Sequence, residues 1–111
     1  MPLTRDFKAT VQARIRKDPA FRKALLRDGV QCLISGDLDA GKTILRDYIN
    51  ATIGFEALSD LTDKPAKSLM RMLGPSGNPT ARNLIEVIGY LRKAEGVRFE
   101  LSTKGQRTIR A

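Results

Sequence analysis

Apolar residues recur at helical spacing along most of the chain, between residues that start and stop helices. Asp18 and Pro19 are typical of a helix start, which predicts a helix over about 19–35 that ends at Gly36. Asp37 or Asp39 can cap a second helix over about 38–53, closed by Gly54. Two short helices, 55–61 and 66–73, are expected next. Thr80 is expected to cap a helix of about 80–95, which Gly96 ends.

That last helix has the clearest amphipathic pattern. Its predicted apolar face is formed by Ala81, Leu84, Ile85, Ile88 and Leu91. The segment 7–15 is ambiguous, because its apolar residues alternate as in a strand while Phe7, Val11 and Ile15 also stand four apart, as on a helix. Its alanines and long polar residues favour a helix, so residues 1–17 are expected to be an N-terminal helical segment.

Val97, Phe99 and Leu101 alternate with Arg98 and Glu100, which predicts one β-strand over 97–101. A strand needs a partner for its backbone groups. We expect it to pair with its copy in a second subunit, so that Val97, Phe99 and Leu101 form the dimer contact. It could instead pair with 7–15, or lie extended against the last helix. Residues 102–111 are expected to be a basic, flexible tail. The predicted fold is mainly α, with five to six helices and one C-terminal strand.

Composition restricts the chemistry. Hydrophobic residues make up 41% of the chain, as in folded domains. The sequence has no His and one Cys, Cys32, which excludes His-dependent catalysis, His-ligated metals and an internal disulfide. No cofactor is therefore expected. No apolar run is long enough for a membrane span, and the first residues lack the apolar stretch of a signal peptide, so a cytoplasmic protein is expected.

The charge of the chain indicates its partner. The net charge is +8 and the isoelectric point is near 10.2. The excess of Lys and Arg is divided evenly between residues 1–50 and 51–111. A basic balance of this kind favours a polyanionic partner, usually nucleic acid.

Residues 36–43, GDLDAGKT, fit the phosphate-loop pattern GxxxxGK[ST]. That loop must lie between a buried strand and a helix, whereas a helix is predicted on both sides here. Asp37 and Asp39 would also place carboxylates beside an anion. We therefore interpret the match as accidental and expect no nucleotide site and no enzyme. Gly41, Lys42 and Thr43 are expected on a helix surface, where Lys42→Ala would leave stability and DNA binding nearly unchanged.

The two short helices fit a helix-turn-helix, in which the second helix has a polar, basic outer face. Leu58 and Thr62, with small Ser59 between them, suit the first helix. Leu69 and Met72 suit the inner face of the second helix. The residues left outside are Lys64, Lys67, Ser68 and Arg71. The alternative is a helical hairpin with an ordinary solvated face.

From about residue 18 to 101 the chain resembles a family of small bacterial and prophage regulators. These carry the phage-repressor-like (Xre/Cro) helix-turn-helix, and many are antidote proteins of addiction modules, similar to HigA-type antitoxins. The likeness is carried by the sequences GFEALS (54–59), KSLMRML (67–73), GNPT (77–80) and NLI (83–85), with SGDL (35–38) and LRDY (45–48) upstream. One departure is Asp63, which stands where the turn of many such motifs has Gly.

The resemblance implies a helical DNA-binding domain over 18–101, with its helix-turn-helix at about 55–73. It implies a transcriptional regulator, an antitoxin that represses its own toxin–antitoxin operon. The implied partners are double-stranded DNA, a small RNase toxin and a second copy of the chain. The predicted DNA-binding residues are Lys64, Lys67, Ser68, Arg71, Ser76, Asn78, Thr80 and Arg82. The alternative is a toxin-neutralising or general helical protein-interaction module with little DNA affinity.

Overall fold

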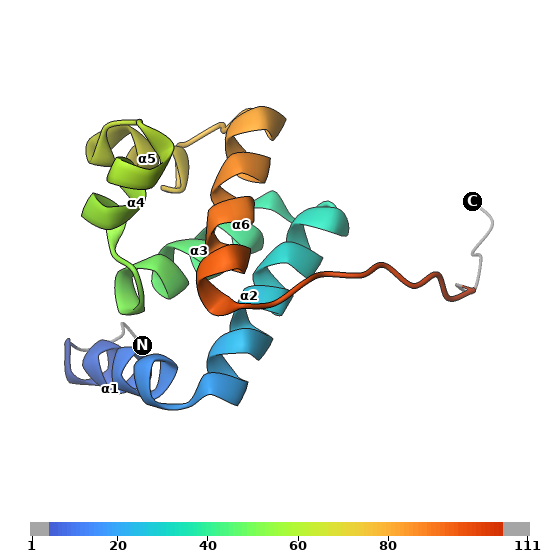
Figure 1. Ribbon diagram of the computed structural model, residues 1–111, viewed down its shortest axis with the longest axis horizontal. Coiled ribbons are helices and arrows are strands. Elements are labelled where there is room, and N and C mark those ends of the chain that lie inside the picture. The colour runs from blue at the N-terminus through green and yellow to red at the C-terminus, as the bar shows by residue number, and fades with distance from the viewer. Residues whose placement is uncertain (1–4, 106–111) are drawn as a thin grey trace.

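The computed structural model describes residues 5–105, and within them the chain is mainly helical (Figure 1). The helices are α1 (Arg5–Lys17), α2 (Pro19–Ile34), α3 (Leu38–Ala51), α4 (Phe55–Thr62), α5 (Ala66–Met72) and α6 (Ala81–Glu95). Helices α2 and α3 pack against each other, and α1 packs across both at one end of the molecule. At the other end α4 contacts α5 and α6.

The helix starts predicted from the sequence are confirmed. Asp18 Oδ1 accepts a hydrogen bond from the Phe21 N–H at 3.1 Å, and Pro19 follows it in the first turn of α2. Asp37, rather than Asp39, caps α3. The Thr80 hydroxyl oxygen accepts from the backbone of the first turn of α6, also at 3.1 Å. These side chains satisfy N–H groups that have no partner within the helix.

The core is mostly aliphatic, and all five helices from α2 to α6 contribute residues to it. Its buried members are Leu26, Leu45, Tyr48, Ile49, Phe55, Leu58, Leu69, Leu73, Val87 and Leu91. On α6 the buried stripe is centred on Val87 and Leu91, with Leu84 and Ile88 partly buried. Ala81 is exposed and Ile85 is 69% exposed, so the predicted face was wrong at these two positions. Successive helical residues are about 100° apart, which places Ile85 at the edge of the stripe.

Helices α2 and α3 approach closely at a pair of glycines. Gly29 and Gly41 are both buried. A Cβ on Gly41 would lie 2.5 Å from Leu33 Cδ2 and 3.2 Å from the Gly29 carbonyl oxygen. Lys42 is also buried, at 3% exposure, whereas Thr43, the next residue, is exposed. The prediction that Gly41 and Lys42 lie on a helix surface was therefore wrong. Helix α2 precedes residues 36–43, where a phosphate loop requires a strand.

The ambiguous segment 7–15 belongs to a helix, α1, and so supplies no strand. Ile15 is fully buried and Val11, four residues earlier, is partly buried, so these two residues lie on the packed side of the helix.

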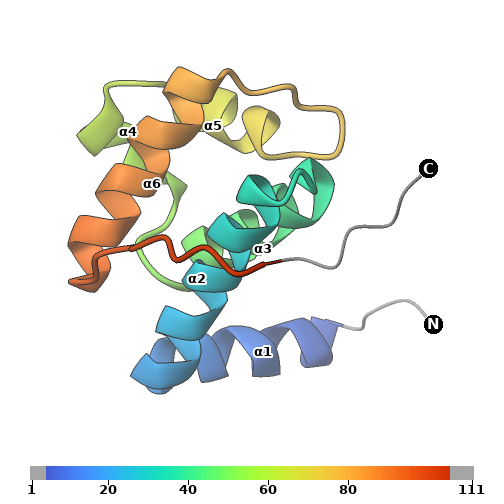
Figure 2. The ribbon, with the colours of Figure 1, turned by 90° about the vertical axis from the view of Figure 1, so that its right-hand side faces the viewer.

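The predicted strand over 97–101 is absent, and no strand occurs elsewhere in residues 5–105. The segment is extended instead and leaves α6 along the flank of the helices (Figure 2). Val97 and Phe99 pack against the core of their own chain, whereas Leu101 is 79% exposed. The Val97 N–H donates to the Arg92 carbonyl, and the Arg92 guanidinium donates to the Val97 carbonyl. Pairing of this segment as a strand with its copy in a second subunit is therefore not supported, whereas the dimer contact of Val97, Phe99 and Leu101 stays a prediction. Residues 102–105 are exposed, and the rest of the predicted tail lies outside the described residues.

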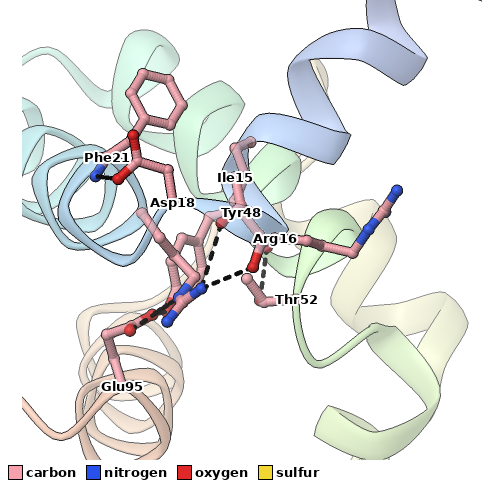
Figure 3. Close-up of polar contacts among 8 residues, drawn as sticks. Ile15, Arg16, Asp18, Phe21, Tyr48, Thr52 and Glu95 are labelled. Carbon is pink, nitrogen blue, oxygen red and sulfur yellow. Dashed lines mark hydrogen bonds and ion pairs between the residues drawn. The ribbon is translucent and has the colours of Figure 1, made fainter.

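A partly buried ion pair links α2 to α6 (Figure 3). Arg22 Nε donates to both carboxylate oxygens of Glu95, at 2.8 and 2.9 Å. The Tyr48 hydroxyl, from α3, donates to the same carboxylate. Arg22 Nη1 also donates to the carbonyl of Arg16, at 3.1 Å, and so bonds to the end of α1. One network therefore connects four helices.

Candidate nucleic-acid interface

Helices α4 and α5 pack through the residues that the sequence assigned to their inner faces. Leu58, Thr62 and Leu69 are buried, and Met72 is partly buried. The buried Thr62 hydroxyl donates to the Leu58 carbonyl at 2.8 Å, so burial leaves it with a partner. The partly buried Ser59 donates through its hydroxyl to the carbonyl of Lys64, across the turn between the helices.

The turn between α4 and α5 depends on Asp63. This residue adopts the left-handed conformation, with φ 57° and ψ 34°, and is the one non-glycine residue with positive φ among those described. Asp tolerates this conformation better than most residues. Asp63 therefore takes the left-handed conformation at the position where the turn of many such motifs has Gly. The turn then reaches Pro65, which directly precedes the first residue of α5.

The predicted DNA-binding residues of the helix-turn-helix differ in their exposure to solvent. Lys67, Ser68 and Arg71 are exposed on α5. Lys64 is half-buried, and its Nζ lies 3.0 Å from Glu86 Oε2 of α6 in an ion pair. Its charge is therefore balanced within the chain.

An open cavity of about 490 Å³ lies between α5, the following loop and the start of α6. Its lining residues are Lys64, Pro65, Ser68, Leu69, Arg71, Met72, Ser76, Gly77, Asn78, Pro79, Thr80 and Asn83. Of the predicted DNA-binding residues only Lys67 and Arg82 are not part of this lining, and both are exposed. The structure thus gathers the remaining predicted side chains around one groove.

The loop that forms one wall of the groove lies directly on the end of α5. A Cβ on Gly77 would fall 2.2 Å from the Arg71 carbonyl oxygen and 2.3 Å from that of Met72, so only glycine fits. From the other side, Lys42 Nζ donates to the Gly77 carbonyl at 2.7 Å. Sequence reasoning missed Gly77 and Lys42 as parts of this site. The GNPT sequence was a signal for the first, whereas Lys42 was visible only within an accidental motif.

The exposed face of α5 and the first turn of α6 carry positive charge that no partner within the described residues neutralises. Lys67 and Arg71 of α5 and Arg82 of α6 form no ion pair there. On α4 the exposed charged residues are Glu56 and Asp60, so the charge changes sign between the two helices. Guanidinium, ammonium, hydroxyl and amide groups of this kind donate to phosphates and to base edges.

Residues 5–105 contain no cluster of acidic and cysteine side chains that could hold a metal ion. In the same residues no helix combines the length and the apolar character needed to cross a membrane. No protein-family model, curated protein or solved structure matches this chain.

Proposed function

We propose that this protein is a sequence-specific DNA-binding transcriptional regulator that uses α4, its turn and α5 as a helix-turn-helix. The observation that carries the proposal is the exposed row of Lys67, Ser68 and Arg71 on α5, beside a groove lined with hydrogen-bonding side chains. A B-DNA major groove is about 12 Å wide and accepts one α-helix. Helix α5 is the reading helix in this proposal.

In this proposal the candidate side chains have different roles. Lys67 and Arg71 supply the charged contacts, because Lys64 is already paired with Glu86. Ser76 and Asn78 lie on the loop beside α5, and their neutral groups are suited to hydrogen bonds that orient the protein on the duplex. The basic excess of the whole chain, +8, adds attraction to the phosphates at long range.

The family resemblance supports a narrower proposal: a cytoplasmic antitoxin that represses its own operon and binds a small RNase toxin. Regulators of this kind bind paired half-sites as two-fold dimers. A dimer of this chain would use a surface other than the 97–101 segment, whose apolar residues Val97 and Phe99 pack against their own core.

The test is mobility-shift titration at several salt concentrations, with the DNA upstream of the protein's own coding sequence and a random duplex of equal length. Arg71→Ala should cost about 1–3 kcal/mol on the specific site if Arg71 contacts a base. Lys67→Ala should weaken both duplexes and flatten the salt dependence by about one unit of slope if Lys67 contacts a phosphate.

The matched control is Lys23→Ala/Arg27→Ala, which removes equal charge from exposed positions of α2. If the Lys67→Ala/Arg71→Ala pair binds as tightly as this control, α5 does not contact the DNA.

A specific observation also favours the alternative, a protein-interaction module. Leu61 and Ile85 are apolar side chains of α4 and α6 that are 47% and 69% exposed. Because α4 and α6 contact each other, exposed apolar side chains on these two helices are available to a protein partner. Under this alternative, Leu61→Asp/Ile85→Asp would prevent binding of an RNase encoded beside the gene, and the wild-type protein would show no preference for its upstream DNA.

A further inference from the structure

We propose that Lys42 is a positioning residue for DNA binding: through the Gly77 carbonyl it fixes the loop 74–79 where Ser76 and Asn78 can meet the duplex. This inference rests on the proposed function and adds to it a residue that lies on α3, outside the helix-turn-helix. Lys42 cannot reach DNA itself, because only 4% of its side chain is exposed.

The bond from Lys42 to Gly77 is the principal polar contact of a buried ammonium group. Its Nζ lies 2.7 Å from the Gly77 carbonyl oxygen. Asp39 Oδ1 lies farther away, at 3.7 Å, and the Asp39 side chain is 91% exposed, so water weakens that pair. A buried charge is costly unless it is hydrogen-bonded, which makes the carbonyl a strongly preferred partner.

The loop is fixed on its opposite side by α5. The Gly74 N–H donates to the Arg71 carbonyl at 3.1 Å, and the Gly77 N–H donates to the Gly74 carbonyl at 3.0 Å. Because Gly77 lies directly against the Arg71 and Met72 carbonyls at the end of α5, the loop cannot move closer to that helix. Lys42 holds it from the side of α3. Ser76 and Asn78 flank Gly77 in the chain, so the bond to Lys42 limits the positions of both.

Removal of this bond should have a distinct effect on DNA binding. A loop that must be ordered during binding lowers the affinity, because the entropy of its side chains is then lost at that step. Ser76 and Asn78 are neutral, so the number of phosphates neutralised stays the same. We therefore expect weaker specific binding with an unchanged salt dependence, unlike the effect of Lys67→Ala.

The experiment compares Lys42→Met with Asp39→Asn, which removes the weaker partner only. Titrations use the upstream duplex at a temperature where circular dichroism shows each variant to be folded. Lys42→Met should bind roughly tenfold more weakly, from the cost of ordering two side chains. Asp39→Asn should bind like the wild type, and Lys42→Arg, which retains a cationic donor, should recover most of the affinity. If Lys42→Met does not fold, Lys42→Gln takes its place.

A double-mutant cycle separates positioning from a loss of stability. In a Ser76→Ala/Asn78→Ala background the substitution of Lys42 should have little further effect, because the groups it positions are gone. An equal loss in both backgrounds, or no loss in either, would overturn the positioning role while leaving the proposed function intact. A wild-type protein that does not distinguish the upstream duplex from random DNA would overturn both.

Discussion

The carboxylate of Glu95 is almost shielded from solvent, with 4% of its side chain exposed. Arg22 forms an ion pair with it, and the Tyr48 hydroxyl donates a hydrogen bond to it. Loss of Arg22 would leave the nearly buried carboxylate of Glu95 without its charged partner. We predict that Arg22→Met lowers the free energy of unfolding by about 3 kcal/mol, measured by urea denaturation.

Arg27 provides the control for this prediction. It pairs with Asp28 at 3.7 Å, and both side chains are mostly exposed. Arg27→Met should therefore change the unfolding free energy by no more than about 0.5 kcal/mol. Similar losses for the two arginines would mean that burial adds nothing to the Arg22–Glu95 pair.

Burial raises the pKa of the Tyr48 hydroxyl above its ordinary value of 10.0, and the bond to Glu95 and the charge of that carboxylate raise it further. Arg22 opposes the rise. In the unfolded chain Tyr48 loses its proton near pH 10, while in the folded protein it keeps it. The unfolded state then binds fewer protons, so the stabilising contribution of Tyr48 is present below about pH 10 and is lost as the pH rises above it.

We predict that the difference in unfolding free energy between the wild type and Tyr48→Phe shifts against the wild type by about 1.4 kcal/mol per pH unit above pH 10. Urea denaturation of both proteins at several alkaline pH values measures this difference. A difference that stays constant with pH would show that Tyr48 ionises equally in both states.

At the residue scale the sequence predicted the roles that depend on near neighbours in the chain. Asp18, Asp37 and Thr80 cap helices because each accepts from a backbone N–H three residues away. The burial of Lys42 could not be predicted, because its partner Gly77 lies 35 residues farther along the chain. A lysine counts as polar in any pattern, so only the packed structure shows that its side chain is buried.

At the element scale, the two glycines inside α3 and α6 differ in what surrounds them. A Cβ at Gly41 would meet the side chain of Leu33 at 2.5 Å, whereas a Cβ at Gly89 would meet nothing within 4 Å. We predict that Gly41→Ala lowers the unfolding free energy by about 1–3 kcal/mol, because α2 and α3 must separate or Leu33 must move. Gly89→Ala should raise it by about 0.5–1 kcal/mol, because alanine favours the helix.

Thermal and urea denaturation of the two variants test whether the unfolding free energy falls in Gly41→Ala and rises in Gly89→Ala. A stabilised Gly41→Ala would mean that Leu33 moves aside without cost and that the close approach of α2 and α3 does not depend on Gly41.

Helix bounds were predictable because capping residues and glycines act locally. Which helical face is buried was less predictable: on α6 the buried stripe includes Val87 and leaves Ile85 exposed, since the position of the neighbouring helices decides it. The alternation of 97–101 correctly implied that Val97 and Phe99 share a side. It could not indicate whether another strand or the helices of the same chain cover that side.

At the scale of the whole molecule, the chain brings α5, the 74–79 loop and the start of α6 together around one groove. The exposure of Lys67, Ser68 and Arg71 could be predicted, because it follows from helical spacing within α5. The pairing of Lys64 with Glu86 could not, because the two residues are 22 positions apart and meet only after α4 packs on α6.

The C-terminal segment provides the last prediction. Phe99 packs on the core of its own chain, whereas Leu101, two residues later, is 79% exposed. Phe99→Asp removes apolar contacts and places a charge against the core, so it should lower the unfolding free energy by about 2 kcal/mol. Leu101→Asp should change it by less than about 0.5 kcal/mol. Because Phe99 belongs to the fold of one chain, neither substitution should change the oligomeric state of the folded protein, measured by sedimentation velocity below the unfolding temperature. If the wild type is a dimer and the folded Phe99→Asp protein is a monomer, this segment is a subunit contact.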